Sequence, residues 1–145
     1  MSNITPELPP NLLEGWQIVV VDDEPDSLEV AQIILEAYGA TVHTASNGAE
    51  GLALVKSVRP KLVISDISMP VMDGWGFAEA IKNDRTTMDI PMIALTAHAM
   101  PGDREKAIAA GFHNHLTKPL TVDSFIHDLI KLLVEIPAFA DQLKV

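Results

Sequence analysis

Five polar residues stand at the ends of short apolar runs, and their types suit phosphoryl chemistry. They are Asp22, Asp23, Asp66, Thr96 and Lys118. Carboxylates brought together would repel one another strongly, and Mg²⁺, a hard divalent cation that prefers oxygen ligands, relieves that repulsion. A lysine ammonium and a threonine hydroxyl suit phosphoryl oxygens. The pattern therefore predicts a metal and phosphate site, with Asp66 as the possible nucleophile.

Convergence of these residues requires a particular arrangement of strands and helices. Short apolar runs predict strands at residues 18–21, 41–44, 62–65, 92–95 and 114–116. Segments typical of helices, bounded by Pro, Gly or capping residues, follow them at 25–39, 47–58, 75–83, 102–110 and 122–135. Five such repeats predict an α/β fold with a doubly wound parallel sheet. In these sheets ligands bind at the carboxyl ends of the strands, where the polar residues stand.

Composition restricts the function further. The chain has 145 residues, 48% of them hydrophobic, which is enough for one compact domain, and 0 Cys, which excludes disulfides and Cys-ligated metals. The formal net charge of −10 argues against binding to nucleic acid or to an anionic membrane. The sequence opens with neither a basic leader nor a hydrophobic stretch of signal-peptide length, so we expect a cytoplasmic protein.

The sequence also predicts three segments along the chain. Residues 1–15 are an N-terminal extension, residues 16–136 are the folded domain, and residues 137–145 are a C-terminal tail. We expect the proline-containing extension to be solvated. The alternative is that it packs against the domain through three apolar side chains, Leu12, Leu13 and Trp16.

Four segments carry a resemblance to a known family. They read VVVDDEP at residues 19–25, LVISDISMPVMDGWG at 62–76, ALTAHA at 94–99 and LTKPL at 116–120. Together they are highly specific, and the chain from about residue 16 to 135 resembles the receiver domain of response regulators in two-component signalling, of the stand-alone, chemotaxis type. The resemblance implies a flavodoxin-like fold, in which a five-stranded parallel sheet of order 2-1-3-4-5 is covered by five helices.

The resemblance also implies a role for each residue of the site. Asp66 resembles the aspartate that becomes an acyl phosphate, and Lys118 resembles the lysine that pairs with the phosphoryl group. Asp23 and Asp66, with the backbone carbonyl of Ser68, resemble the direct Mg²⁺ ligands, and Asp22 resembles the acid that holds metal-bound water. These roles agree with phosphoryl transfer, which depends on positioning and on neutralising the charge of the phosphoryl oxygens.

Two further residues resemble the family's conformational switch. Thr96 resembles the hydroxyl that moves toward the phosphoryl group, and Ala97 beside it leaves room for that movement. The family's usual Tyr or Phe, three positions before the lysine, is replaced here by His115. Because an imidazole is smaller than a phenyl ring and gains charge near neutral pH, we expect a weaker or pH-sensitive switch.

The resemblance implies a phosphoacceptor that is not an enzyme beyond its own phosphorylation and dephosphorylation. A histidine kinase or phosphotransfer protein would dock across the first helix, near Pro25 and Leu28, and would phosphorylate Asp66. Because the chain ends soon after the last predicted helix, we expect no output domain. The signal would pass to an unidentified protein by contact or onward phosphotransfer, from a monomer or a weak phosphorylation-dependent dimer.

Two other function classes remain as alternatives. A haloacid-dehalogenase-like phosphohydrolase also forms an aspartyl phosphate, but it carries a second acid two residues after its nucleophile, where this chain has Ser68. A degenerate receiver would signal by protein contact alone, and the presence of all five key residue types argues against it.

Overall fold

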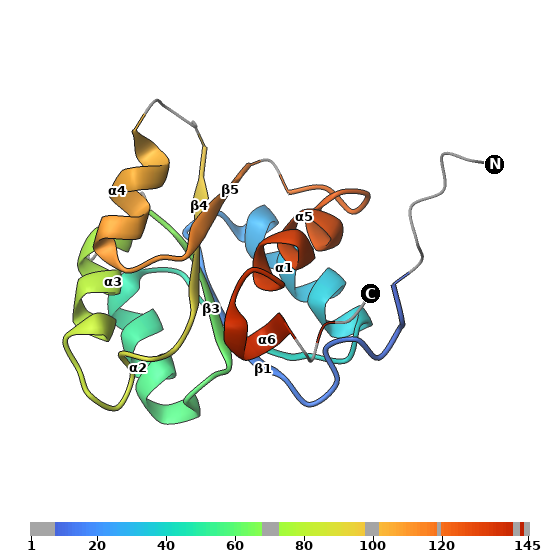
Figure 1. The fold of residues 1–145 in the computed structure, drawn as a ribbon, viewed down its shortest axis with the longest axis horizontal. Coiled ribbons are helices and arrows are strands. Elements are labelled where there is room, and N and C mark those ends of the chain that lie inside the picture. The colour runs from blue at the N-terminus through green and yellow to red at the C-terminus, as the bar shows by residue number, and fades with distance from the viewer. Residues whose placement is uncertain (1–7, 68–72, 98–101, 119, 141–142, 144–145) are drawn as a thin grey trace.

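The protein is an α/β domain built on one parallel sheet (Figure 1). The structure is a computed structural model that describes residues 8–67, 73–97, 102–118, 120–140 and 143. Within these residues the strands are β1 (Gln17–Val21), β2 (Thr41–Ala45), β3 (Leu62–Asp66), β4 (Met92–Thr96) and β5 (Asn114–Thr117). The sheet has five strands in the order β2-β1-β3-β4-β5, which confirms the expected flavodoxin-like topology.

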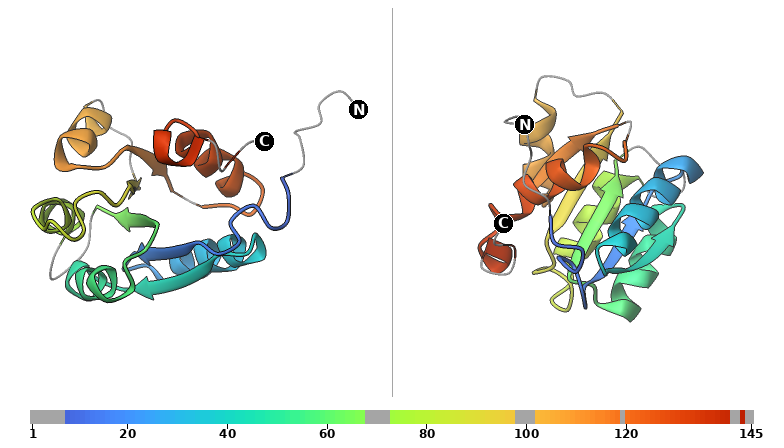
Figure 2. Two further views of the ribbon diagram at one scale, coloured as in Figure 1. Left: turned by 60° about the horizontal axis from the view of Figure 1, so that its bottom comes forward. Right: turned by 90° about the vertical axis from the view of Figure 1, so that its right-hand side faces the viewer.

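Helices connect the strands and cover both sides of the sheet (Figure 2). They are α1 (Pro25–Ala37), α2 (Gly48–Val58), α3 (Gly74–Lys82), α4 (Asp103–Ala110), α5 (Phe125–Leu133) and α6 (Pro137–Ala140). The described residues thus contain six helices, where the sequence predicted five. The additional helix is α6, a short segment that begins at Pro137, within the residues predicted to form a C-terminal tail.

The last long helix also begins later than predicted. Residues 122–124 form a turn, and α5 starts at Phe125, whose backbone N–H donates to the carbonyl of Thr121 at 3.0 Å. The hydroxyl of Thr121 accepts from the N–H of Ser124 at 3.3 Å. Thr121 therefore closes the turn that leads into the helix, rather than capping a helix that begins at residue 122.

Two apolar cores lie on opposite faces of the sheet because successive strand residues point to opposite sides. On one face, Ile18 and Val20 pack with buried residues of α1 and α5. On the other face, Val19 and Val21 pack with buried residues of α2, α3 and α4. This two-sided burial is why the strands read as continuous apolar runs, and it holds their carboxyl ends in fixed positions.

The segments on either side of the predicted domain pack against the first core. Leu13 is fully buried, and its N–H donates to the carbonyl of Tyr38 at 2.8 Å. The rings of Trp16 and Phe139 lie with centroids 4.7 Å apart, and Leu143 is also buried. The structure thus shows the packed alternative for residues 9–16, and residues 137–140 do not form a free tail. The boundaries at residues 16 and 136 stay predictions.

One glycine permits the approach of the N-terminal segment. Gly39 has φ +100°, which favours glycine, and a Cβ placed on it would lie 2.9 Å from the Cα of Glu14. Any other residue would therefore push the backbone near Glu14 away from the end of α1.

Candidate functional site

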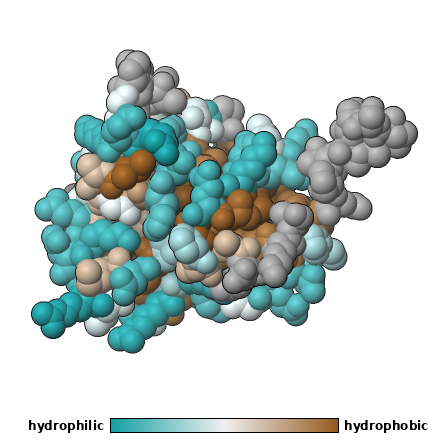
Figure 3. All heavy atoms as spheres, in the orientation of Figure 1, coloured by the Kyte–Doolittle hydropathy of each residue, from teal (hydrophilic) through white to brown (hydrophobic). Residues whose placement is uncertain are grey.

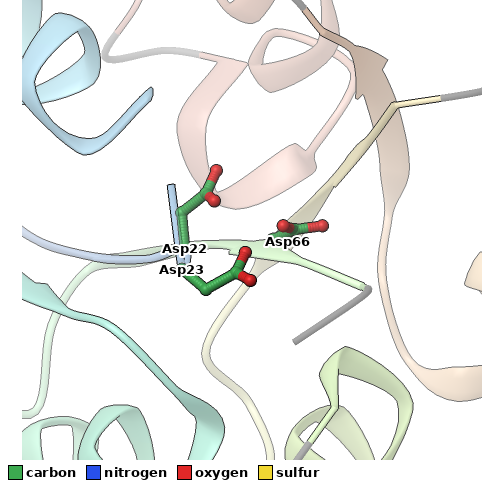
Figure 4. A group of neighbouring side chains, drawn as sticks. All are labelled: Asp22, Asp23 and Asp66. Atoms are coloured by element: carbon green, nitrogen blue, oxygen red, sulfur yellow. The ribbon is translucent and has the colours of Figure 1, made fainter. Parts of the chain in front are cut away.

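The carboxyl ends of β1 and β3 bring three carboxylates together, as the sequence predicts. Asp22 and Asp23 directly follow β1, Asp66 is the last residue of β3, and the two strands are neighbours in the sheet. One oxygen from each side chain lies within 4.8 Å of the other two (Figure 4). Asp22 and Asp66 are buried and Asp23 is exposed, so the cluster opens to solvent on one side.

Lys118 reaches the same cluster from the end of β5. Its Nζ lies 2.9 Å from Asp22 Oδ2 and 3.0 Å from Asp66 Oδ2, and only 8% of its side chain is exposed. Since β5 is at the edge of the sheet and two strands, β3 and β4, separate it from β1, the long lysine side chain is what joins them. The structure therefore places four of the predicted site residues, Asp22, Asp23, Asp66 and Lys118, around one point.

Glu24 is a residue of this site that the sequence analysis missed. It lies at the N-cap position of α1, where its side chain makes no capping hydrogen bond. Instead, Glu24 Oε1 accepts from Lys118 Nζ at 2.5 Å. Its position directly after the acidic pair was a signal that could have drawn attention to it, but spacing alone does not tell where an exposed side chain turns.

Burial and charge give Asp22 an unusual ionisation. Burial raises its pKa to about 6, with a smaller rise from the negative charge of Asp66, against the opposing hydrogen bonds from Lys118 and from the N–H of Glu24. Lys118 shows the reverse balance. Burial disfavours its ammonium, but hydrogen bonds to Glu24, Asp22 and Asp66 outweigh burial and hold its pKa above the ordinary value. The site is thus a buried acid beside a firmly charged ammonium.

Thr96 and His115 lie on the two strands beyond Asp66. Thr96 is the buried last residue of β4, and its carbonyl accepts from the N–H of Lys118 at 2.8 Å. His115 is half-buried on β5 opposite Ala94, and within the described residues its buried Nδ1 has no hydrogen-bond partner. His115 and Asp128 line the same hollow of about 220 Å³ between β5 and α5.

The carboxylate cluster fits a Mg²⁺ ion. Mg²⁺ binds oxygen ligands at about 2.1 Å, so opposite ligands lie about 4.2 Å apart. The oxygens of Asp22, Asp23 and Asp66 lie within 4.8 Å of one another, close to that separation. The pKa of Asp22 is raised chiefly because burial disfavours its charged form, with a smaller rise from Asp66, and a cation beside the carboxylate relieves that penalty. Ser68, the remaining ligand implied by the resemblance, lies outside the described residues.

A groove of about 380 Å³ opens beside Lys118. It lies between α1 and the segment that follows β5, and it is lined by Glu24, Asp26, Ser27, Val30, Ala97, Lys118 and Leu120. The groove gives a molecule in solvent a route to the ammonium of Lys118.

Comparison with known proteins identifies the family. The family model described as the response regulator receiver domain matches residues 18–130. The chain is 42% identical over 108 residues to an uncharacterized 14.6 kDa protein of Leptolyngbya boryana, with 74% of this chain and 82% of that protein covered. It is 32% identical over 112 residues to the polar-differentiation response regulator DivK of Brucella anthropi, with 77% and 91% covered.

A solved structure agrees with these relatives. The structure of the chemotaxis response regulator CheY4 of Vibrio cholerae superposes with a TM-score of 0.76 at 29% identity, and the alignment covers 81% of this chain and 98% of that one.

The chain belongs to the response regulator receiver domain family, as the resemblance indicated. Members of this family are signalling modules of two-component systems rather than metabolic enzymes, and they generally bind Mg²⁺ at a cluster of aspartates such as the one described above. None of the helices in the described residues has the length and apolar character needed to span a membrane.

Proposed function

We propose that the protein is a phosphoacceptor that takes a phosphoryl group on Asp66 and signals through other proteins. The observation that carries this proposal is the position of Asp66, which ends β3 within the carboxylate cluster and 3.0 Å from the buried ammonium of Lys118. A carboxylate between a cation site and a fixed ammonium can attack phosphorus while both positive groups draw charge from the phosphoryl oxygens.

Asp66, Lys118 and Thr96 each have a defined part in the transfer. A carboxylate oxygen of Asp66 forms the new bond to phosphorus as the bond from phosphorus to the donor breaks. Lys118 contacts a phosphoryl oxygen and neutralises part of its charge. Thr96, buried at the end of the neighbouring strand, donates its hydroxyl to another phosphoryl oxygen. Catalysis then consists of positioning and charge compensation, and no general acid is required.

Asp23, Asp66 and the carbonyl of Ser68 would hold Mg²⁺ directly, and Asp22 would hold a water of its shell. The bound ion would supply positive charge opposite Lys118 and orient the phosphoryl oxygens. The burial of Asp22 supports its part in this scheme, because a buried carboxylate accepts hydrogen bonds from a metal-bound water without competition from bulk solvent.

The donor in this proposal is a histidine kinase or a phosphotransfer protein. The groove between α1 and the segment after β5 leads to Lys118, and Leu28 on α1 is partly buried against the core. A donor that presents a phosphohistidine can therefore lie across α1 while its phosphoryl group enters the site. The cytoplasmic location expected from the sequence is part of the same proposal.

The output in this proposal is protein contact, or onward phosphotransfer, from the surface of α4, β5 and α5. Two large apolar side chains are exposed at or beside these elements: Ile108 on α4 by 42%, and Val122 in the turn before α5 by 71%. Hydrophobic patches set among hydrophilic side chains are visible on the face in Figure 3. Movement of Thr96 toward the phosphoryl group would let His115 change position in its hollow beside α5, which alters this surface.

The test is the intact mass of the protein after incubation with Mg²⁺ and acetyl phosphate. We expect an adduct with the mass of one phosphoryl group that is absent from Asp66→Asn and absent when the metal is chelated. Asp26→Asn, which removes an exposed carboxylate from the nearby groove, is the matched control and should form the adduct. An unmodified protein with this donor and with a generic histidine kinase would refute the proposal.

A further inference from the structure

Every N–H donor of the Lys118 ammonium is used in a contact with a carboxylate. An ammonium carries three N–H donors. Lys118 Nζ contacts Asp22 at 2.9 Å, Asp66 at 3.0 Å and Glu24 at 2.5 Å. A phosphoryl oxygen that is to accept a hydrogen bond from Lys118 must therefore displace one of these three carboxylates.

Glu24 is the carboxylate that can leave. The side chains of Asp22 and Asp66 are 0% and 5% exposed, and both belong to strand ends held by the sheet. The Glu24 side chain is 58% exposed, so water can solvate its carboxylate after it parts from Lys118. Glu24 also lines the groove through which a phosphodonor reaches Lys118.

The side chain of Glu24 does not cap the helix that it precedes, and its contact with Lys118 is the only hydrogen bond of that side chain in the described residues. At an N-cap position, a side-chain oxygen normally accepts a hydrogen bond from the first turn of the helix. Glu24 makes no such bond. Replacing its carboxylate by an amide therefore alters the site and leaves α1 intact.

We propose that Glu24 is a positioning residue that holds Lys118 in the unphosphorylated protein and must release it before Lys118 can contact an incoming phosphoryl group. This inference rests on the proposed function, because it assigns Lys118 the phosphoryl contact. Glu24 then slows phosphorylation of Asp66 by competing with the phosphoryl oxygens for one N–H donor.

The first measurement is the second-order rate constant for phosphorylation by acetyl phosphate at saturating Mg²⁺. The contact joins a buried ammonium to a partly exposed carboxylate, and removing such a competitor corresponds to about a three- to tenfold increase in rate. We expect that increase in Glu24→Gln. Glu24→Asp keeps the charge but shortens the reach to Lys118, so it should also react faster than the unmodified chain.

Asp26→Asn is the control for charge alone. Asp26 lines the same groove, and it is not one of the three carboxylates that Lys118 contacts in the described part of the chain. Its removal relieves general repulsion of an anionic donor without freeing Lys118. We expect a change of less than about twofold in this variant.

The second measurement uses metal-free protein and needs no phosphorylation. Acetylation of Lys118 by an N-hydroxysuccinimide ester, followed by peptide mass spectrometry, reports how firmly the ammonium is held. Glu24→Gln should raise the acetylation rate of Lys118 severalfold relative to that of exposed Lys131 in the same molecule, whereas Asp26→Asn should leave this ratio unchanged.

The outcomes separate the inference from the proposed function. If Glu24→Gln reacts with acetyl phosphate no faster than Asp26→Asn, or if acetylation of Lys118 is unchanged, Glu24 does not hold the lysine and the inference is wrong. If the unmodified chain takes up no phosphoryl group at all, the proposed function fails, and the acetylation ratio alone decides whether Glu24 restrains Lys118.

Discussion

Asp22→Asn should stabilise the metal-free protein, and the gain should depend on pH. The pKa of Asp22 is 3.8 in an ordinary environment and about 6 in the fold. A carboxyl whose pKa is raised by folding contributes stability that is present in full below pH 3.8 and is lost as the pH rises through 6. At about 1.4 kcal/mol for each pKa unit, the loss at pH 8 is about 3 kcal/mol. Asparagine cannot ionise, so the variant avoids this loss of stability.

The assay is urea unfolding in the presence of EDTA from pH 4.5 to 8. The free energy of unfolding of Asp22→Asn should exceed that of the native chain by about 3 kcal/mol at pH 8 and by about 1 kcal/mol at pH 4.5. Asp26→Asn, which removes an exposed carboxylate, should differ from the native chain by less than about 0.5 kcal/mol throughout. A constant difference across this range, or a variant less stable than the native chain at pH 8, would refute the reasoning.

Mg²⁺ should reverse the order of stability of the native chain and Asp22→Asn. A ligand at about 1,000 times its Kd stabilises the fold by about 4.1 kcal/mol, more than the advantage of about 3 kcal/mol that the variant has at pH 8. The native chain receives that stabilisation, whereas a variant that lacks the Asp22 carboxylate binds the ion more weakly. If Mg²⁺ stabilises both proteins equally, Asp22 takes no part in holding the ion.

Three further outcomes are expected. Leu13→Ala should lower the free energy of unfolding by about 3 kcal/mol, because the side chain is fully buried, and a loss below about 1 kcal/mol in urea unfolding would show that the N-terminal segment is not packed. Gly39→Ala should cost about 1 to 3 kcal/mol more than Gly102→Ala in the same assay, since both have positive φ but only a Cβ at Gly39 meets backbone atoms. Beryllofluoride should alter the amide chemical shifts of β5, and any dependence of this alteration on pH between about 6 and 8 should be absent from His115→Phe. If the variant shows the same pH dependence as the native chain, His115 is not the pH-sensitive element.

The sheet and the position of the site could be predicted from local patterns. Short apolar runs that end at a polar residue identified β1, β3 and β4 and their carboxyl ends. Those ends are where the structure places Asp22, Asp66 and Thr96. The strand order needed the family resemblance, because periodicity within a strand carries no information about which strand lies beside it.

The packing of the two terminal segments escaped local patterns for a physical reason. Leu13 and Phe139 lie in short segments that begin with prolines, with no period that predicts an element. Both are buried in the same core as Trp16, whose ring lies 4.7 Å from that of Phe139 and 4.6 Å from the ammonium of Lys61. The contact between Trp16 and Phe139 joins residues more than 120 positions apart in the chain, so only the folded structure reveals it.

In the proposed function, Lys118 contacts Glu24 and Asp22 in the unphosphorylated protein and a phosphoryl oxygen during the transfer. In the metal-free protein, Lys118 is the cation nearest to the buried Asp22 and Asp66 carboxylates among the described residues, and without it their burial would cost far more. In the proposed function, a Mg²⁺ ion held by the carboxylates would supply part of that compensating charge and lower their demand on the ammonium. Lys118 would then contact a phosphoryl oxygen once Glu24 releases it. On this proposal, metal binding and phosphoryl acceptance are coupled through the ammonium that both carboxylates share.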